Sequence, residues 1–145
     1  MPDTASPQRL SHLGLAVRDL DAAISLYRDV FGLEVERRWE SEGEQIRAAA
    51  LRLGDIQIEL MEPMSEDSPV GRFVTRRGEG IHHIAFQVAD IRRSLSAARE
   101  AGLDLAGEAP RRGGTGDTEI GFLHPRGTFG VLIELEQDVE PRPGS

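Results

Sequence analysis

The stretch His12-Leu-Gly-Leu-Ala-Val-Arg-Asp-Leu20 recurs in the second half of the chain as His83-Ile-Ala-Phe-Gln-Val-Ala-Asp-Ile91. Both copies have the alternation that is typical of a short strand, and both end at an aspartate. An internal repeat of this kind predicts a chain built from two similar modules.

A helical pattern follows each copy. In the first module, apolar residues recur at helical spacing over residues 20–31, with Asp19 as the expected N-cap and Gly32 as the expected end. In the second module, a shorter apolar stripe lies between a cap at Asp90 and a stop at Gly102. The two halves therefore begin with the same strand and helix.

Strand-like segments follow both helices, at residues 33–40, 47–53 and 56–61, and again at 103–107, 119–123 and 130–136. A linker with a short helix at residues 68–77 joins the halves. The predicted fold class is α+β: two βαβββ modules in tandem (8–62 and 81–137) that form a partly closed, barrel-like mixed sheet. They make a single domain over residues 8–137, with loose tails at 1–7 and 138–145.

Composition excludes several classes of function. The chain has 145 residues and a formal net charge of −8, which argues against nucleic-acid binding. It contains no apolar run long enough to span a membrane and no export pattern at its N-terminus, so we expect a cytoplasmic protein. Cysteine is absent and all 17 basic residues are arginine, which excludes disulfides, thiolate nucleophiles and lysine Schiff bases.

Four residues occupy matching places in the two modules. His12 and His83 lie on the first strands, and Glu59 and Glu134 on the last strands, where alternation places the glutamates on the less apolar face. Imidazole and carboxylate together suit a divalent first-row metal ion. A lone strand histidine is usually scaffold and a lone glutamate usually faces solvent, but recurrence in both modules makes a metal site an equal alternative to these interpretations.

The remaining polar signals are less specific. His82 points away from His83 and is interpreted as scaffold, whereas His124, before a proline at a strand end, is either structural or a substrate contact. The loop over residues 111–116 either binds a phosphate or acyl group through backbone N–H groups or is a simple connection.

The order of motifs resembles the methylmalonyl-CoA epimerase family of the vicinal oxygen chelate (glyoxalase I-like) superfamily. The motifs that carry this resemblance include Leu53-Gly-Asp-Ile-Gln-Ile-Glu-Leu-Met-Glu-Pro63, Gly78-Glu-Gly-Ile-His-His-Ile-Ala-Phe86, Phe122-Leu-His-Pro125 and Gly130-Val-Leu-Ile-Glu-Leu135. The resemblance covers roughly residues 10 to 137.

The resemblance implies that one divalent ion (Co, Ni, Zn, Mn or Mg) is bound by His12, Glu59, His83 and Glu134. Relatives carry either glutamine or glutamate at the Glu59 position. It implies an isomerase that interconverts (R)- and (S)-methylmalonyl-CoA by proton transfer at carbon 2 through a metal-stabilised enolate, with Glu134 as one base. Some members carry a second proton-transfer glutamate where this chain has Ala48. Glu44 is the candidate for this missing acid or base. Alternatively, Glu44 is a solvated loop residue without a catalytic role.

The expected partner is an acyl-CoA substrate, with no nucleic acid and no membrane, in a homodimer. Cobalt is one expected metal. Two other functions stay open: a glyoxalase I-type lyase or another vicinal oxygen chelate isomerase, for which the same ligands would serve, and a non-catalytic resistance protein that binds a small molecule. The intact set of four candidate ligands weighs against the resistance protein.

Overall fold

A computed structural model describes residues 3–139 of the chain. Contacts divide the chain into two compact units. The first unit comprises residues 12–82. The second begins at His83 and includes the N-terminal segment up to Ser11.

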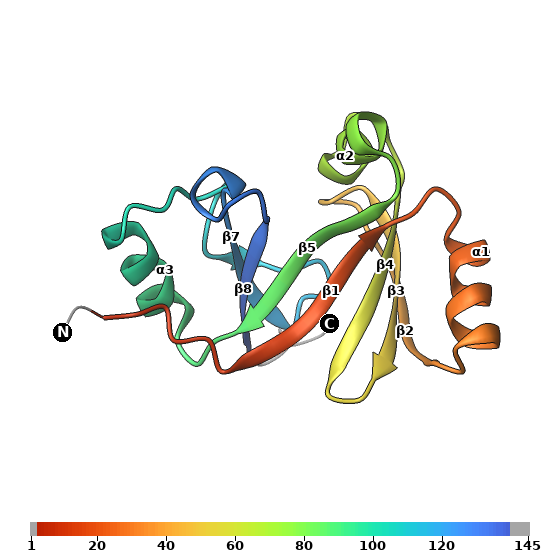
Figure 1. Ribbon diagram of the computed structural model, residues 1–145, viewed down its shortest axis with the longest axis horizontal. Helices are drawn as coiled ribbons and strands as arrows, with labels where there is room; N and C mark the ends of the chain where they lie inside the picture. Colours follow the sequence, from red (N-terminus) through yellow and green to blue (C-terminus); the bar gives the residue numbers. More distant parts are fainter. Residues whose placement is uncertain (1–2, 140–145) are drawn as a thin grey trace. The chain divides into compact units, whose positions relative to one another are not determined.

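The first unit contains four strands of a mixed sheet, two α-helices and one π-helical segment (Figure 1). Its elements are β1 (Arg9–Ala16, which enters this unit at His12), α1 (Leu20–Ser25), the π-helical η1 (Leu26–Val30), β2 (Glu34–Ser41), β3 (Ile46–Leu53), β4 (Ile56–Pro63) and α2 (Pro69–Arg77). The strand order is β2-β3-β4-β1, and only β1 and β4 run parallel.

The second unit repeats this arrangement. Its elements are β5 (Gly80–Gln87, from His83 on), α3 (Ile91–Glu100), β6 (Arg111–Arg112), β7 (Thr118–Leu123), the 3-10 turn η2 (Pro125–Gly127) and β8 (Ile133–Asp138). The strand order is β5-β8-β7-β6, and only β5 and β8 run parallel. The α+β fold class and the two βαβββ modules are therefore confirmed.

Each sheet packs one face against the helix that follows its first strand (Figure 1). The cluster beneath α1 consists of Leu20, Ile24, Ala49, Leu51, Ile58 and Leu60. The cluster beneath α3 consists of Val88, Ile91, Leu95, Ala98, Leu123 and Leu135. Because side chains alternate along a strand, the residues between these core positions project from the other face of each sheet.

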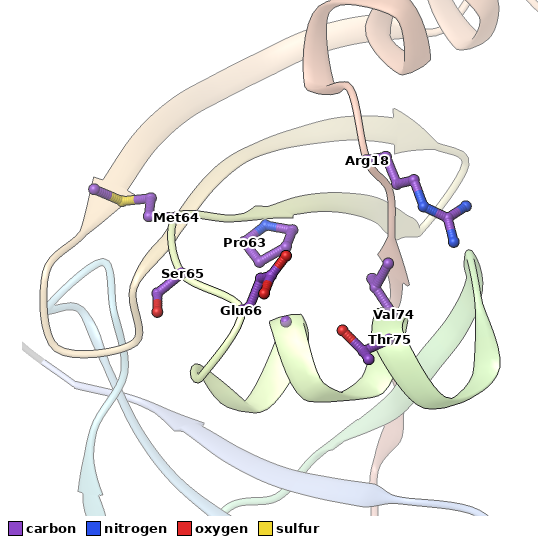
Figure 2. A pocket seen from close by; sticks show the side chains of 8 residues that line it. Arg18, Pro63, Met64, Ser65, Glu66, Val74 and Thr75 are labelled. Carbon is purple, nitrogen blue, oxygen red and sulfur yellow. The ribbon is translucent and has the colours of Figure 1, made fainter.

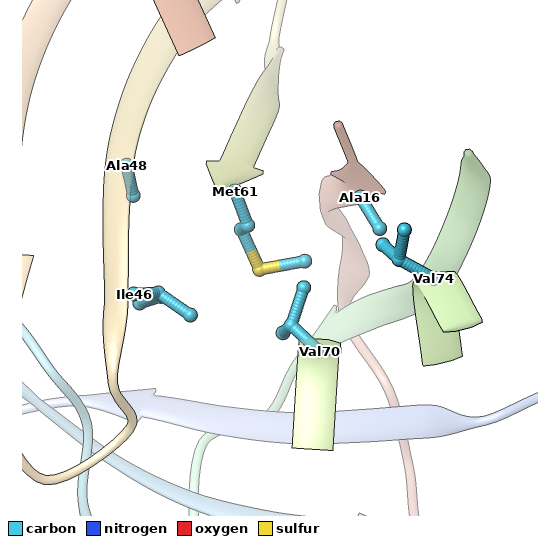
Figure 3. Close-up of a cluster of buried hydrophobic side chains, with 6 residues drawn as sticks. All are labelled: Ala16, Ile46, Ala48, Met61, Val70 and Val74. Atoms are coloured by element: carbon cyan, nitrogen blue, oxygen red, sulfur yellow. The ribbon is translucent and has the colours of Figure 1, made fainter. Parts of the chain in front are cut away.

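The helix α2 covers part of that other face in the first unit. Figure 3 shows Val70 and Val74 of α2 pointing toward Met61 of β4, Ala16 of β1, and Ile46 and Ala48 of β3. The expected helix at 68–77 is thus confirmed, with Ser68 as its N-cap.

The predicted helix caps are also confirmed. The Asp19 carboxylate accepts a hydrogen bond from the Ala22 N–H at 3.0 Å, and Asp90 accepts one from Arg93 N–H at 3.2 Å. Gly32 and Gly102 end the helical segments with φ of +72° and +96°. The first segment is α-helical only as far as Ser25, where it continues as the π-helix η1.

The predicted strand at 103–107 is wrong. Leu105 forms only an isolated bridge with Leu123, and the strand that pairs with β7 on the side away from β8 is β6. The extended conformation cannot continue through Gly107, whose φ is +89°. The last strand likewise begins at Ile133 rather than at residue 130, because Phe129 and Gly130 have positive φ in a tight turn.

The N-terminal segment contacts α3 of the second unit. Asp3 pairs with Arg93 at 3.2 Å, and the Ala5 carbonyl accepts a hydrogen bond from Ser94 Oγ at 2.6 Å. Of the segments predicted to be loose, residues 1–2 and 140–145 lie outside the described part. Within residues 3–139, no helix has the length and apolar character needed to cross a membrane.

Candidate functional site

The first predicted pair lies on adjacent parallel strands of the first unit. Strand pairing places Gly14 of β1 beside Glu59 of β4 and His12 beside Gln57. In this register His12 Nε2 lies 3.6 Å from Glu59 Oε2. His12 is buried and Glu59 is partly buried. The structure therefore brings these two predicted ligands together.

The second pair has the same register. Ala85 of β5 lies beside Glu134 of β8, so His83 is two residues before the partner of the glutamate, as His12 is in the first unit. His83 Nε2 lies 3.2 Å from Glu134 Oε1, and both residues are buried. The repeat thus reproduces the same histidine–glutamate pair in each unit.

Both pairs project from the face opposite the α1 or α3 core. Glu59 alternates with the core residues Ile58 and Leu60, and Glu134 alternates with Leu135. A buried carboxylate beside an imidazole needs a compensating charge or hydrogen bond. The nitrogen and oxygen donors of each pair match the preferences of a divalent transition ion. The residues present therefore fit the predicted metal.

Sequence reasoning missed several neighbours of the second pair. The ring of Phe122 meets that of His83 edge-on, with centroids 5.6 Å apart. The guanidinium carbon of Arg111 lies 5.9 Å from the Phe122 ring centroid. Glu136 is buried on the same strand face as Glu134, and its carboxylate accepts a hydrogen bond from Ser11. The period-two alternation of β8 is the signal that would have indicated Glu136.

The two positions that bear on a second acid or base, Ala48 and Glu44, lie in the first unit. Ala48 is buried in the apolar cluster beneath α2. Glu44 lies in the turn between β2 and β3, where its N–H donates to Ser41 Oγ at 3.1 Å. Ala50 is the β3 residue paired with Glu59. Glu44 comes six positions before Ala50 and two positions before β3 begins at Ile46. Glu44 therefore lies outside the strand that pairs with Glu59, in the turn before it.

The two other histidines make local contacts. The His82 ring packs edge-on against Phe73, with centroids 5.0 Å apart, which agrees with a scaffold role. His124 caps η2, since its Nδ1 accepts a hydrogen bond from the Arg126 N–H at 3.0 Å. The loop after β6 is closed by a bond from the Arg112 guanidinium to the Gly116 carbonyl at 2.8 Å.

A cavity of about 390 Å³ lies in the first unit between the end of β4 and α2 (Figure 2). Its lining residues are Arg18, Pro63, Met64, Ser65, Glu66, Gly71, Val74 and Thr75. None of the four predicted ligands lines this cavity. Arg18 is held by Glu79, which accepts bonds from the Arg18 backbone and guanidinium.

Comparison with known families and structures agrees with this architecture. The profile of the Glyoxalase/Bleomycin resistance protein/Dioxygenase superfamily matches residues 11–122. The chain belongs to this superfamily. The chain is also 35% identical to an ethylmalonyl-CoA/methylmalonyl-CoA epimerase of Cereibacter sphaeroides, over 89% of this chain and 97% of the relative.

Two solved structures show the same fold. A methylmalonyl-CoA epimerase variant of Streptomyces coelicolor, in complex with 2-nitronate-propionyl-CoA, is 38% identical and superposes with a TM-score of 0.88 over 93% of this chain and 100% of that one. The methylmalonyl-CoA epimerase of Mycobacterium tuberculosis is 37% identical, with a TM-score of 0.88 over 97% and 94% of the two chains. The predicted superfamily and fold are confirmed.

Proposed function

We propose that the chain is a methylmalonyl-CoA epimerase, an isomerase that interconverts the (R) and (S) forms by moving the proton on carbon 2. The observation that carries this proposal is the histidine–glutamate pair in each unit, at the same register of the corresponding parallel strands. Full-length similarity to epimerases, one of them bound to an acyl-CoA analogue, supports the substrate class.

His12, Glu59, His83 and Glu134 would together hold one divalent ion. When bound, the ion would supply Lewis acidity toward the oxygens of the acyl-CoA. The two imidazoles favour a transition ion such as cobalt, nickel or zinc over magnesium, which prefers oxygen ligands. Metal analysis of protein purified without chelator identifies the ion, and a stoichiometry near zero would argue against this ligand set.

Glu134 is the proposed base. Its carboxylate is held within 3.2 Å of the His83 ring in a buried environment, which limits the orientations it can adopt. An oriented carboxylate of this kind can accept the carbon-2 proton. A second group must return a proton on the other side of the carbon. Glu44 is the sequence-based candidate, and Glu44→Gln tests it: loss of epimerisation supports the assignment, whereas full turnover places the second acid elsewhere.

The proposed reaction is tested by incubation of the protein with methylmalonyl-CoA in deuterated water. We expect deuterium at carbon 2, detected by mass spectrometry, and loss of the exchange after chelation. Ethylmalonyl-CoA in the same assay measures tolerance for a longer acyl group. Absence of label together with turnover of a glutathione hemithioacetal would instead support the lyase. The homodimer and cytoplasmic location also remain predictions, and sedimentation velocity tests the first.

The ligand set is tested by His83→Ala, with His82→Ala as the matched control on the neighbouring residue. We expect His83→Ala to lose bound metal while its circular dichroism spectrum is retained, because the imidazole is replaced by a methyl group that fits the site. His82→Ala should keep its metal, since its ring packs on Phe73. Unchanged metal content in His83→Ala would remove His83 from the set.

A further inference from the structure

Strand register in the second unit places an arginine on the same sheet face as the proposed base. Phe122 of β7 lies opposite Glu134 of β8, and Ile120 lies opposite Arg111 of β6. Residues that lie directly opposite one another, and alternate residues along one strand, share a face. Arg111, Phe122 and Glu134 therefore project from the same side of the sheet.

The other face of this sheet is occupied by α3. Leu123 and Leu135 belong to the cluster with Leu95 of α3, and a Cβ on Gly121 would come within 3.0 Å of Leu95. Arg111 is thus on the side that the helix does not cover, together with the His83–Glu134 pair. The proposed function assigns no role to this residue.

Phe122 lies in contact with both Arg111 and His83 of the proposed metal-binding pair. The Arg111 guanidinium carbon lies 5.9 Å from the Phe122 ring centroid, and the same ring packs edge-on against His83. A guanidinium over an aromatic ring is attracted by the π-electrons and restricted in orientation. Phe122 of β7 lies directly opposite Glu134 of β8. The Arg111 guanidinium therefore extends from β6 over β7, the strand that pairs with the strand of the proposed base.

We propose that Arg111, oriented by Phe122, binds the free carboxylate of the acyl-CoA and selects for acyl groups that carry one. The inference rests on the proposed function. In methylmalonyl-CoA the carboxylate is bonded to carbon 2, so a cation that binds it must lie beside the base that removes the carbon-2 proton. The planar fork of a guanidinium matches the two oxygens of a carboxylate.

The test compares affinities for methylmalonyl-CoA and propionyl-CoA, which lacks the carboxylate, by isothermal titration calorimetry. We expect Arg111→Met to weaken methylmalonyl-CoA binding by about 10- to 100-fold, as for loss of a charge-assisted hydrogen bond, and to leave propionyl-CoA binding unchanged. Arg111→Lys should recover part of the loss, and Phe122→Leu should lose part of it. Metal content should be unchanged in Arg111→Met, which separates carboxylate binding from a disturbed His83.

Arg112→Met is the matched control. Arg112 neighbours Arg111 on β6, pairs with Glu119 in the strand register, and donates to the Gly116 carbonyl. Its replacement should leave the preference for methylmalonyl-CoA over propionyl-CoA unaltered. An equal change of this preference in both variants would overturn the assignment to Arg111.

Three further outcomes identify the anion that Arg111 binds and separate failure of this inference from failure of the proposed function. If Arg111→Met weakens both CoA esters equally but spares methylmalonyl-pantetheine, which lacks the nucleotide phosphates, Arg111 binds phosphate and the carboxylate assignment is wrong. If the wild-type protein exchanges deuterium into methylmalonyl-CoA while Arg111→Met keeps full affinity, the inference fails and the proposed function stands. Absence of both binding and exchange in the wild type removes the proposed function itself.

Discussion

The two modules carry the same histidine–glutamate pair in surroundings that differ. In the first, the side chains of His12 and Glu59 are 6% and 17% exposed, and the atoms of the pair are 3.6 Å apart. In the second, His83 and Glu134 are 3% and 7% exposed and 3.2 Å apart. The second pair is therefore more buried and more tightly held.

The residues around the two pairs differ in chemistry as well. On the pair's side of the first sheet, Ala48 and Met61 pack against α2 as part of an apolar cluster. The second sheet instead carries Phe122, Arg111 and the buried Glu136 on its corresponding face. Strand pairing keeps the candidate ligands in place in both modules, while the surrounding side chains have diverged. The face that carries the pair is therefore mainly apolar in the first module and carries charged side chains in the second.

The largest expected effect is on the exchange rate at carbon 2, and it should differ between Glu134 and Glu59. Glu134→Gln should lower the exchange rate at carbon 2 by about 10²- to 10⁴-fold, the range for loss of a general base. Glu59→Gln should lower it by about tenfold or less, because the family that the sequence resembles accepts glutamine at this position. Deuterium exchange and metal analysis of both variants measure the difference. Equal losses would mean that the two modules share the chemistry evenly.

The next largest effect is on the free energy of unfolding. It depends on the packing of α2 in the first module. Gly71 of α2 approaches the Ser65–Glu66 backbone so closely that an added Cβ would clash with the Ser65 carbonyl oxygen and lie 2.9 Å from the Glu66 Cα. Gly71→Ala should lower the free energy of unfolding by about 1–3 kcal/mol, as for other overpacked sites. Gly43→Ala is the control, since no heavy atom lies within 4 Å of its added Cβ. Calorimetric unfolding of both variants tests this, and equal stability would show that the loop yields readily.

The smallest expected effect is on the free energy of unfolding, and it differs between one exposed phenylalanine of each module. Phe129 is fully exposed with φ of +58°, whereas Phe31 is exposed with φ of −93° and packs on Tyr27. Phe129→Gly should raise the free energy of unfolding by about 0.5–1 kcal/mol, because relief of left-handed strain exceeds the backbone entropy of glycine. Phe31→Gly should lower it by a similar amount. Chemical denaturation measures both, and a loss of stability in Phe129→Gly would show that its ring makes a stabilising contact.

Local patterns in the sequence predicted much of this structure. Apolar periodicity located both helices, and Asp19 and Asp90 cap them because an N-cap depends only on backbone groups within one turn. The repeat also predicted that each histidine would share its module with a glutamate. The equal registers of β1 with β4 and of β5 with β8 explain why the pairing holds in both modules.

Other features required the folded chain. Residues 103–107 have strand-like composition, but β7 pairs instead with β6, which lies beyond Gly107. Glu44 matched a family position only by sequence proximity, and it lies in the turn before β3, six positions ahead of the residue that pairs with Glu59. Neither result follows from a local pattern, because strand partners are selected by contacts between residues far apart in the chain.

The sequence by itself determined the duplicated module, the points where the helices begin and the identity of the four candidate ligands, since each depends on periodicity or on side chains within one turn. Only the tertiary structure decided which side chains surround each pair, above all the stack of Arg111 on Phe122 beside His83. Those neighbours come from separate strands, and the register that aligns them depends on hydrogen bonding and burial across the whole sheet.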